Sequence, residues 1–301
     1  MNTVTGELAA LATSLLFSIT SVLFTFASRQ VGSVVLNRIR LLVAIVFLIL
    51  AHLILSIPLP LHVSSQTWFW LGLSGVIGLA LGDVCLFQAY IWIGPRLTML
   101  LMSLAPILAG VLAWIFFDET LNARQIFGIA LTLIGVGWVI LEQNERGQDM
   151  HTDKRYYWLG ILFGLGAATG QALGLVTARK GLSPDFPALT GTLIRMLAAA
   201  AALWGFTILR GQARKTFRQI SEKRSAIPYI LGGAFTGPFL GVTLSLVAIQ
   251  NVELGIASTL MALPPLFLLP IGYFVFKERF GWQAILGTIV AMVGVGLLFV
   301  A

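Results

Sequence analysis

The sequence is a succession of apolar runs, each about 20 residues long, separated by short polar breaks. An α-helix needs a run of that length to cross the hydrocarbon layer of a membrane. The runs are too long for membrane β-strands and do not alternate with period two, which argues against a barrel. The fold class predicted is an all-α integral membrane protein with ten transmembrane helices, near residues 7–27, 34–56, 68–91, 95–116, 124–141, 157–178, 187–209, 227–249, 254–276 and 282–300.

Composition agrees with a membrane location. Hydrophobic residues make up 58% of the chain and charged residues 10%, against about a quarter in soluble domains. The net charge of +7 does not predict nucleic-acid binding, because the basic residues lie in loops and at helix ends, as in membrane proteins. The single cysteine, Cys85, excludes an intrachain disulfide. The first run lacks a basic leader and continues past Ala27, so we interpret it as a retained helix rather than a signal peptide.

The chain also contains an internal repeat. A shift of 159 residues superimposes residues 82–141 on 241–300 without a gap, and further upstream a shift of 155 places Arg40 on Arg195. Other matched pairs are Gly82 with Gly241, Ala89 with Ala248, Pro106 with Pro265, and Gly135 with Gly294. We therefore predict two repeats of five helices each, over residues 1–142 and 157–301, joined by a polar linker at 143–156.

An odd number of helices per repeat makes the second copy enter the membrane from the opposite side, so the repeats are expected to be inverted. Inverted repeats recur in secondary transporters, which bind their substrate near the midplane between the halves. The polar stretch from Arg210 to Ala226 is predicted to be a loop, and it carries many of the loop Lys and Arg residues. By the positive-inside rule, these charges put both termini outside the cytoplasm.

The sequence resembles the drug/metabolite transporter superfamily, specifically the EamA-like transporters, over nearly the whole chain. The resemblance rests on residues found at the same place in both repeats: an arginine in the second helix, an alanine in the third and a proline in the fourth. These are Arg40 and Arg195, Ala89 and Ala248, and Pro106 and Pro265. The segment FFDETLNARQIFGIALTLIGVGW and its echo VFKERFGWQAILGTIVAMVGVGL complete the pattern.

The resemblance implies a ten-helix basket around a central cavity, in the plasma or inner membrane. It implies export or exchange of small metabolites such as amino acids or drugs, often coupled to protons, with no cofactor. It also implies cytoplasmic termini, in conflict with the loop charges. The substrate, the direction of transport and the oligomeric state stay open.

Asp83 is the one acidic residue predicted to lie in the middle of a span. A charge at the bilayer centre costs about 2.5–3.5 kcal/mol on insertion scales, so Asp83 should face a partner or a wet space. Two roles are open: a proton- or cation-binding residue of the transport pathway, or a structural ion pair with Arg40. Arg40 and Arg195, together with Pro106 and Pro265, are interpreted as structural or gating residues.

Uncharged polar residues within the predicted helices are candidates for the substrate or proton pathway. By the resemblance, helices one, three, four, six, eight and nine line the cavity, and they carry Ser18, Gln88, Tyr90, Ser103, Gln171, Thr243, Ser245 and Thr259. Each one alone is explained as well by an interhelical hydrogen bond worth about 0.6 kcal/mol. Glycines at helical spacing, such as Gly78 with Gly82 and Gly128 with Gly135, are predicted to allow close helix packing.

Two rival classes are a membrane-embedded enzyme and a carrier of lipid or polyisoprenoid-linked substrates. Intramembrane aspartyl chemistry needs a pair of carboxylates, and no second mid-span aspartate accompanies Asp83. The three histidines, His52, His62 and His151, have no metal-binding spacing, and the sequence has no P-loop. The sequence thus argues against an enzyme. The lipid carrier stays open, because small relatives of this fold resemble such flippases.

Overall fold

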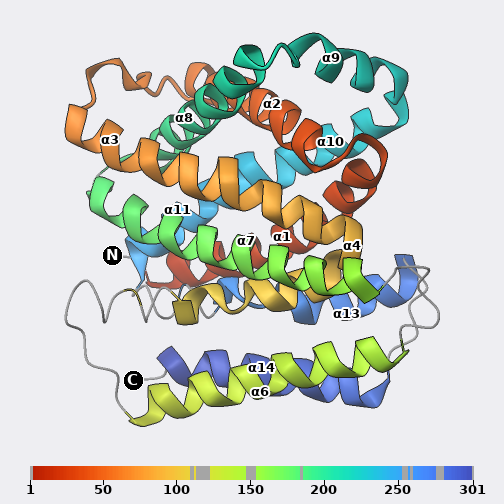
Figure 1. Cartoon of the computed structure of the whole chain (residues 1–301). Helices are drawn as coiled ribbons and strands as arrows, with labels where there is room; N and C mark the ends of the chain where they lie inside the picture. The colour runs from red at the N-terminus through yellow and green to blue at the C-terminus, as the bar shows by residue number, and fades with distance from the viewer. Residues whose placement is uncertain are drawn as a thin grey trace.

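A computed structural model describes residues 3–108, 112, 123–146, 154–183, 186–252, 257, 260–275 and 281–299 (Figure 1). All regular structure within these ranges is helical, which confirms the all-α part of the predicted class, while the count of ten spans stays a prediction. Six stretches are long and apolar enough to cross a membrane: Val4–Val31, Ser33–Ile54, Ser65–Met102, Lys154–Gly181, Ala188–Leu209 and Arg224–Asn251. Shorter apolar helices cover Ile126–Val139, Pro264–Val275 and Ile285–Leu297.

The first repeat begins with two long helices and continues into a composite third span. Its elements are α1 (Thr3–Val31), α2 (Ser33–Ile54), η1 (Pro60–His62), α3 (Ser65–Ser74), the π-helical η2 (Gly75–Gly82), α4 (Asp83–Met102) and α6 (Ala123–Arg146). The helix α4 is interrupted at Gly94, whose φ of 75° favours glycine. Pro95 follows at the first turn of the resumed helix, where its missing N–H costs nothing. The predicted break between the third and fourth spans is therefore confirmed.

The second repeat follows the same order of spans, with the helix α9 in addition before the third span. Its elements are α7 (Lys154–Gly181), α8 (Ala188–Leu209), α9 (Ala213–Glu222), η3 (Arg224–Ala226), α10 (Ile227–Ala234), the π-helical η4 (Phe235–Gly241), α11 (Val242–Asn251), α13 (Pro264–Val275) and α14 (Trp282–Phe299). The π segments η2 and η4 end at Gly82 and Gly241, which are equivalent positions of the repeat. The duplication is thus visible in an unusual backbone feature as well as in side chains.

Each repeat packs its first helix against the third span of the other repeat. The helix α1 contacts α10, η4 and α11, while α7 contacts α3, η2 and α4. Small residues allow the approach of α7, since a Cβ added at Gly170 would lie 2.8 Å from Cα of Gly82. The second helices cross over in the same way, with α8 against η2 and α2 against η4.

The fifth helices of the two repeats, α6 and α14, pack on each other and lie side by side below the other helices in Figure 1. A Cβ added at Gly135 would lie 2.5 Å from the backbone N of Ala291, and one at Gly294 would lie 2.5 Å from that of Thr132. The prediction that glycine stripes serve helix packing is confirmed here and at the contact of η2 with α7.

The predicted loop from Arg210 to Ala226 is wrong, because this stretch contains the helix α9. The stretch is mostly polar, but its residues follow the pattern of an amphipathic helix: Arg214 and Arg218 are exposed, and Thr216 is buried. Buried Arg38 of α2 donates hydrogen bonds of 2.8 Å to Thr216 Oγ1 and 3.2 Å to Gln212 Oε1. These bonds tie α9 to the bundle.

Candidate functional site

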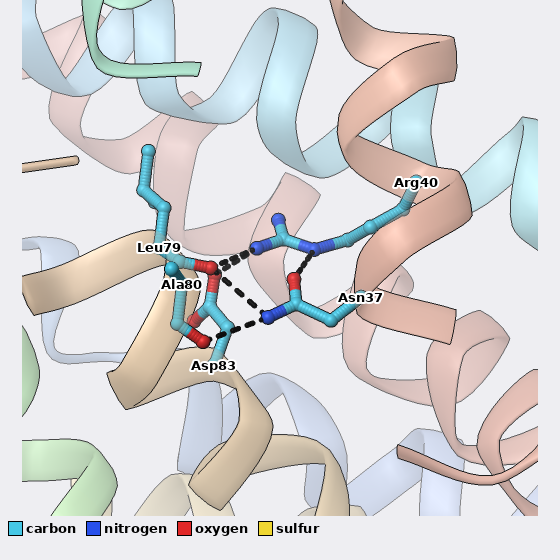
Figure 2. A network of polar contacts seen from close by, with 5 residues as sticks. All are labelled: Asn37, Arg40, Leu79, Ala80 and Asp83. Atoms are coloured by element: carbon cyan, nitrogen blue, oxygen red, sulfur yellow. Dashed lines mark hydrogen bonds and ion pairs between the residues drawn. The ribbon is translucent and has the colours of Figure 1, made fainter. Parts of the chain in front are cut away.

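Asp83 lies where η2 gives way to α4, inside the helical bundle. Its carboxylate forms an ion pair with Arg40 of α2, so the pairing that the sequence left open is present (Figure 2). The Arg40 side chain is 3% exposed, while that of Asp83 retains 13% of its surface. The carboxylate is therefore the more accessible end of the pair.

The backbone of η2 is held by the same side of α2. Asn37 Nδ2 donates to the carbonyl oxygens of Leu79 at 3.1 Å and Ala80 at 2.9 Å. Arg40 Nη2 donates to the Leu79 carbonyl at 3.0 Å, and Arg40 Nε donates to Asn37 Oδ1 at 2.8 Å. Figure 2 shows these contacts converging on the η2 turn. Carbonyl groups in a wide π turn need such partners because buried acceptors without hydrogen bonds are costly.

Asn37 is a site residue that the sequence analysis missed. Asn37 and Arg40 stand three residues apart, so they share one face of α2. Two adjacent polar residues on one face of an otherwise apolar span were the available signal. Their partner acceptors are backbone atoms, however, and side-chain patterns do not reveal those.

Aromatic rings close the other side of the ion pair. The Arg40 guanidinium carbon lies 5.0 Å from the ring centre of Phe87 and 6.0 Å from that of Phe24. Cations are attracted to ring faces at such distances. The Tyr90 side chain is buried beside Phe87, with ring centres 6.0 Å apart. The structure thus brings the predicted residues Asp83, Arg40 and Tyr90 into one cluster.

Arg195 reaches the same region from the second repeat. Its side chain is buried on α8, which packs against η2, and Asp83 is close enough to interact with its charge. A Cβ added at Gly78 would lie 3.8 Å from Arg195 Nη2. Arg40 therefore clamps the neighbouring η2 backbone, while Arg195 has a different environment.

The predicted uncharged residues are more dispersed. Ser18, Ser103, Thr243 and Ser245 each donate to a backbone carbonyl three or four residues earlier in their own helix. Gln88 Oε1 accepts a hydrogen bond of 2.7 Å from Ser33 Oγ of α2. Gln171 is partly buried on α7, and Thr259 lies outside the described residues. Only Gln88 among these hydrogen bonds links two helices.

The two prolines lie just beyond helix breaks at equivalent positions. In the first repeat, a turn at Ser103 and Leu104 separates α4 from the helical residues that include Pro106. In the second repeat, α13 begins at Pro264, so that Pro265 occupies its first turn. Proline fits there because the first turn leaves its N–H groups unpaired. Both repeats thus interrupt their fourth span before the proline.

The fold and the site define a helical membrane protein of two related halves, with an ion pair held inside the bundle. A model of the EamA-like transporter family matches residues 4–141 and, separately, 158–300. The chain therefore belongs to the EamA-like transporter family, as the resemblance predicted. This membership places it among multi-pass membrane transporters of small molecules, a class distinct from enzymes.

A solved structure titled "Crystal structure of protein" has a similar fold. Its TM-score is 0.67 at 17% sequence identity, and the match covers 97% of this chain and 95% of that one. At this identity the likeness concerns the fold alone. Comparison with curated proteins finds no match.

Proposed function

We propose that the chain is a secondary active transporter that exports or exchanges small metabolites, such as amino acids or drugs, by alternating access. In this proposal ten spans form two inverted five-helix repeats, residues 1–142 and 157–301 with a linker at 143–156, around a central cavity in the plasma or inner membrane. Family membership and the reciprocal packing of the repeats support it. Packed halves that repeat one backbone design are suited to rocking against each other.

The observation that carries the proposal is the ion pair of Asp83 with Arg40. Charged residues inside a membrane bundle are expensive and are concentrated at transport pathways. Asp83 also retains exposed surface, so a proton can reach its carboxylate. A proton bound to a carboxylate oxygen of Asp83 removes the charge that attracts Arg40 and loosens α2 from the start of α4. Release of that proton on the other side restores the pair and couples the movement to the proton gradient.

The remaining candidates have subordinate roles in this scheme. Tyr90, Gln88, Ser18, Ser103, Gln171, Thr243, Ser245 and Thr259 are proposed to contribute to the substrate or proton pathway. Arg40 and Arg195, with the helix breaks before Pro106 and Pro265, are proposed to form the structural or gating part. The breaks support this division because an interrupted helix can bend at low cost.

The test begins with a thermal-shift screen of the purified protein against amino acids, nucleobases, sugars and cationic drugs, since ligands of the native state raise its apparent stability. A compound that stabilises the protein is then followed into proteoliposomes. The Asp83→Asn variant should lose accumulation driven by a proton gradient and keep exchange between equal pools. The exposed Glu222→Gln variant is the control and should keep both activities.

Gradient-driven transport by Asp83→Asn at the wild-type rate would remove Asp83 from the coupling step. Absence of transport for every stabilising compound would contradict the proposal as a whole. A carrier of lipid or polyisoprenoid-linked substrates is the alternative, and movement of a fluorescent lipid between leaflets of the same proteoliposomes would favour it.

A further inference from the structure

The cluster around Asp83 contains two arginines and one carboxylate in the part of the chain that the structure describes. Arg40 and Arg195 are equivalent in the repeat, but the position equivalent to Asp83 is Val242. Arg40 holds the Asp83 carboxylate by an ion pair and a hydrogen bond. The cluster therefore carries one positive charge in excess, and that charge is on Arg195.

Arg195 is 2% exposed, and one of its buried donors, Nε, lacks a hydrogen-bond partner. Its buried Nε has no acceptor, and no hydrogen bond or ion pair of its guanidinium is found among the described residues. Asp83 interacts with the Arg195 charge without being hydrogen-bonded to it. Arg40, by contrast, makes hydrogen bonds with Asn37, Leu79 and Asp83. The two equivalent arginines thus differ in their hydrogen-bond partners: Arg40 has three, whereas Arg195 has none among the described residues.

Backbone of η2 and α7 lies near one end of the Arg195 guanidinium. A Cβ added at Gly78 would lie 3.8 Å from Arg195 Nη2, 3.7 Å from the Gly170 carbonyl oxygen and 3.6 Å from Gly174 Cα. Glycines from η2 and α7 therefore flank this end of the side chain, and none of them fills space with a side chain. The neighbouring group that carries charge is Asp83, which is already engaged.

A buried N–H donor of a charged guanidinium without an acceptor is unfavourable, so the resting arrangement is suited to receive an anion. One uncompensated positive charge is balanced by a single negative charge. The planar fork of a guanidinium matches a carboxylate, to which it donates two parallel N–H bonds. A lysine at this position would present only a point charge.

We propose that Arg195 is a binding residue for the carboxylate group of a substrate that carries one carboxylate. This inference rests on the proposed transport function and names the chemical class of its substrate. In the bound state the carboxylate occupies the free Nε–H and Nη2–H of Arg195, beside the glycines of η2 and α7. Asp83 stays paired with Arg40, so substrate recognition and proton coupling are assigned to different arginines.

Thermal shift with matched ligands tests the inference on the full-length purified protein. The probes are leucine with leucinamide, benzoate with benzamide, and inorganic phosphate. We expect at least one acid to raise the apparent melting temperature while its amide has no effect. Arg195→Gln should weaken that acid about 10- to 100-fold, because charge-assisted hydrogen bonds are lost. Arg195→Lys should keep part of the affinity, and Arg218→Gln, whose side chain is 79% exposed, should keep all of it.

Stability without ligand serves as the folding control. Arg195→Gln should melt within a few degrees of the wild type, since it removes no hydrogen bond, and Arg195→Lys gives the same test if the glutamine variant does not fold. Equal shifts by acids and amides, or acid selectivity retained in both Arg195 variants, would overturn the inference. Stabilisation by phosphate and by neither acid would overturn the carboxylate assignment.

Counterflow in proteoliposomes separates this inference from the transport proposal. Wild-type exchange of the stabilising acid that fails in Arg195→Gln, with a neutral ligand from the screen still exchanged, supports carboxylate binding at Arg195. Exchange of the acid that is unchanged in Arg195→Gln overturns the inference and leaves the transporter intact. Absence of exchange for every compound in the wild type contradicts the transport function itself.

Discussion

The two repeats share a backbone design and differ in chemistry. Both contain a π segment that ends at an equivalent glycine, and both interrupt the fourth span before a proline. In the first repeat, Asn37, Arg40 and Asp83 form a connected polar network on the π segment. The corresponding residues of the second repeat, by the shifts of the sequence alignment, are Thr192, Arg195 and Val242.

This difference separates what the architecture needs from what the function needs. The Thr192 hydroxyl donates to the carbonyl of Ala188 in its own helix, so it holds no neighbouring backbone. The second π segment is nevertheless formed, with Pro238 inside it and Thr236 joined to Thr20 of α1 by a 2.7 Å hydrogen bond. A π segment at this position therefore does not require a charged clamp. This difference supports the proposal that the charges of the first repeat have a role in transport.

The largest difference in stability is expected between variants of the two equivalent arginines, Arg40 and Arg195. Arg40→Leu leaves Asp83 as a buried charge without its partner, and we expect a loss of about 3–5 kcal/mol in unfolding free energy. Arg195→Leu removes a guanidinium whose Nε is unpaired, so its stability should be unchanged or higher. Unfolding midpoints of both variants in mild detergent measure the contrast. Equal losses in both would show that the repeats depend on their arginines alike.

The next largest loss of stability is expected at Gly75, the glycine that allows α8 to pack on η2. A Cβ at Gly75 would lie 2.1 Å from the Arg195 carbonyl oxygen, a clash between backbones that Gly75→Ala cannot relieve by rotating a side chain. We expect a loss of about 1–3 kcal/mol. Gly72→Ala is the matched control, because its added Cβ would meet Ala198 at an ordinary 3.5 Å. The second repeat carries Ala234 at the equivalent position. Gly75→Ala therefore also tests whether α8 packs closer to η2 than α2 packs to η4.

A smaller loss of stability is expected from substitution of Asn37. Asn37→Leu leaves the Ala80 carbonyl and Arg40 Nε without partners, at about 1–2 kcal/mol. Its counterpart Thr192→Val removes only a hydrogen bond within one helix turn, so we expect less than about 0.5 kcal/mol. Denaturation of the two variants in parallel decides the point. A larger effect at Thr192 would mean that the second repeat has a network of its own.

The smallest change in stability is expected for an ion pair on the helix α9, an element of the second repeat. Arg218 Nε lies 2.9 Å from Glu222 Oε1, and the two side chains are 79% and 56% exposed. Glu222→Gln should change unfolding free energy by no more than about 0.5 kcal/mol, and less in high salt. By contrast, Arg38→Gln removes the buried bonds that hold α9 and should release this helix to proteolysis. Protection of α9 in Arg38→Gln would contradict its anchoring by α2.

The sequence predicted the features that periodic side chains encode. Apolar runs, the repeat and the glycine stripes gave the helices and their close contacts, and isolated charge in apolar surroundings led to Asp83 and its pairing with Arg40. The π segments escaped prediction because they change hydrogen bonding by one residue without changing composition. The helix α9 escaped because ten residues of mixed polarity resemble a loop until Thr216 is seen to be buried.

The candidate site was predicted only in part, for a similar reason. Ser18, Ser103, Thr243 and Ser245 look like recognition groups in the sequence, but their hydroxyls bond to their own helices. Serine and threonine readily do this in apolar helices. Asn37 looked no more promising than they did, and its role depends on carbonyl groups exposed by a turn that the sequence does not reveal.

The matching π segments also record the order of events in the history of the chain. A widened turn that ends at the same glycine in both halves is explained most simply by one origin, in an ancestor that consisted of a single half before its gene was duplicated. The arginines Arg40 and Arg195 are shared in the same way, but Asn37 and Asp83 correspond to Thr192 and Val242, so these two positions changed after the duplication. An ancestral pair of identical subunits would have been symmetric in charge as well as in backbone. Once the two halves were fused in one chain, each could change independently, which accounts for the different polar residues of the two repeats.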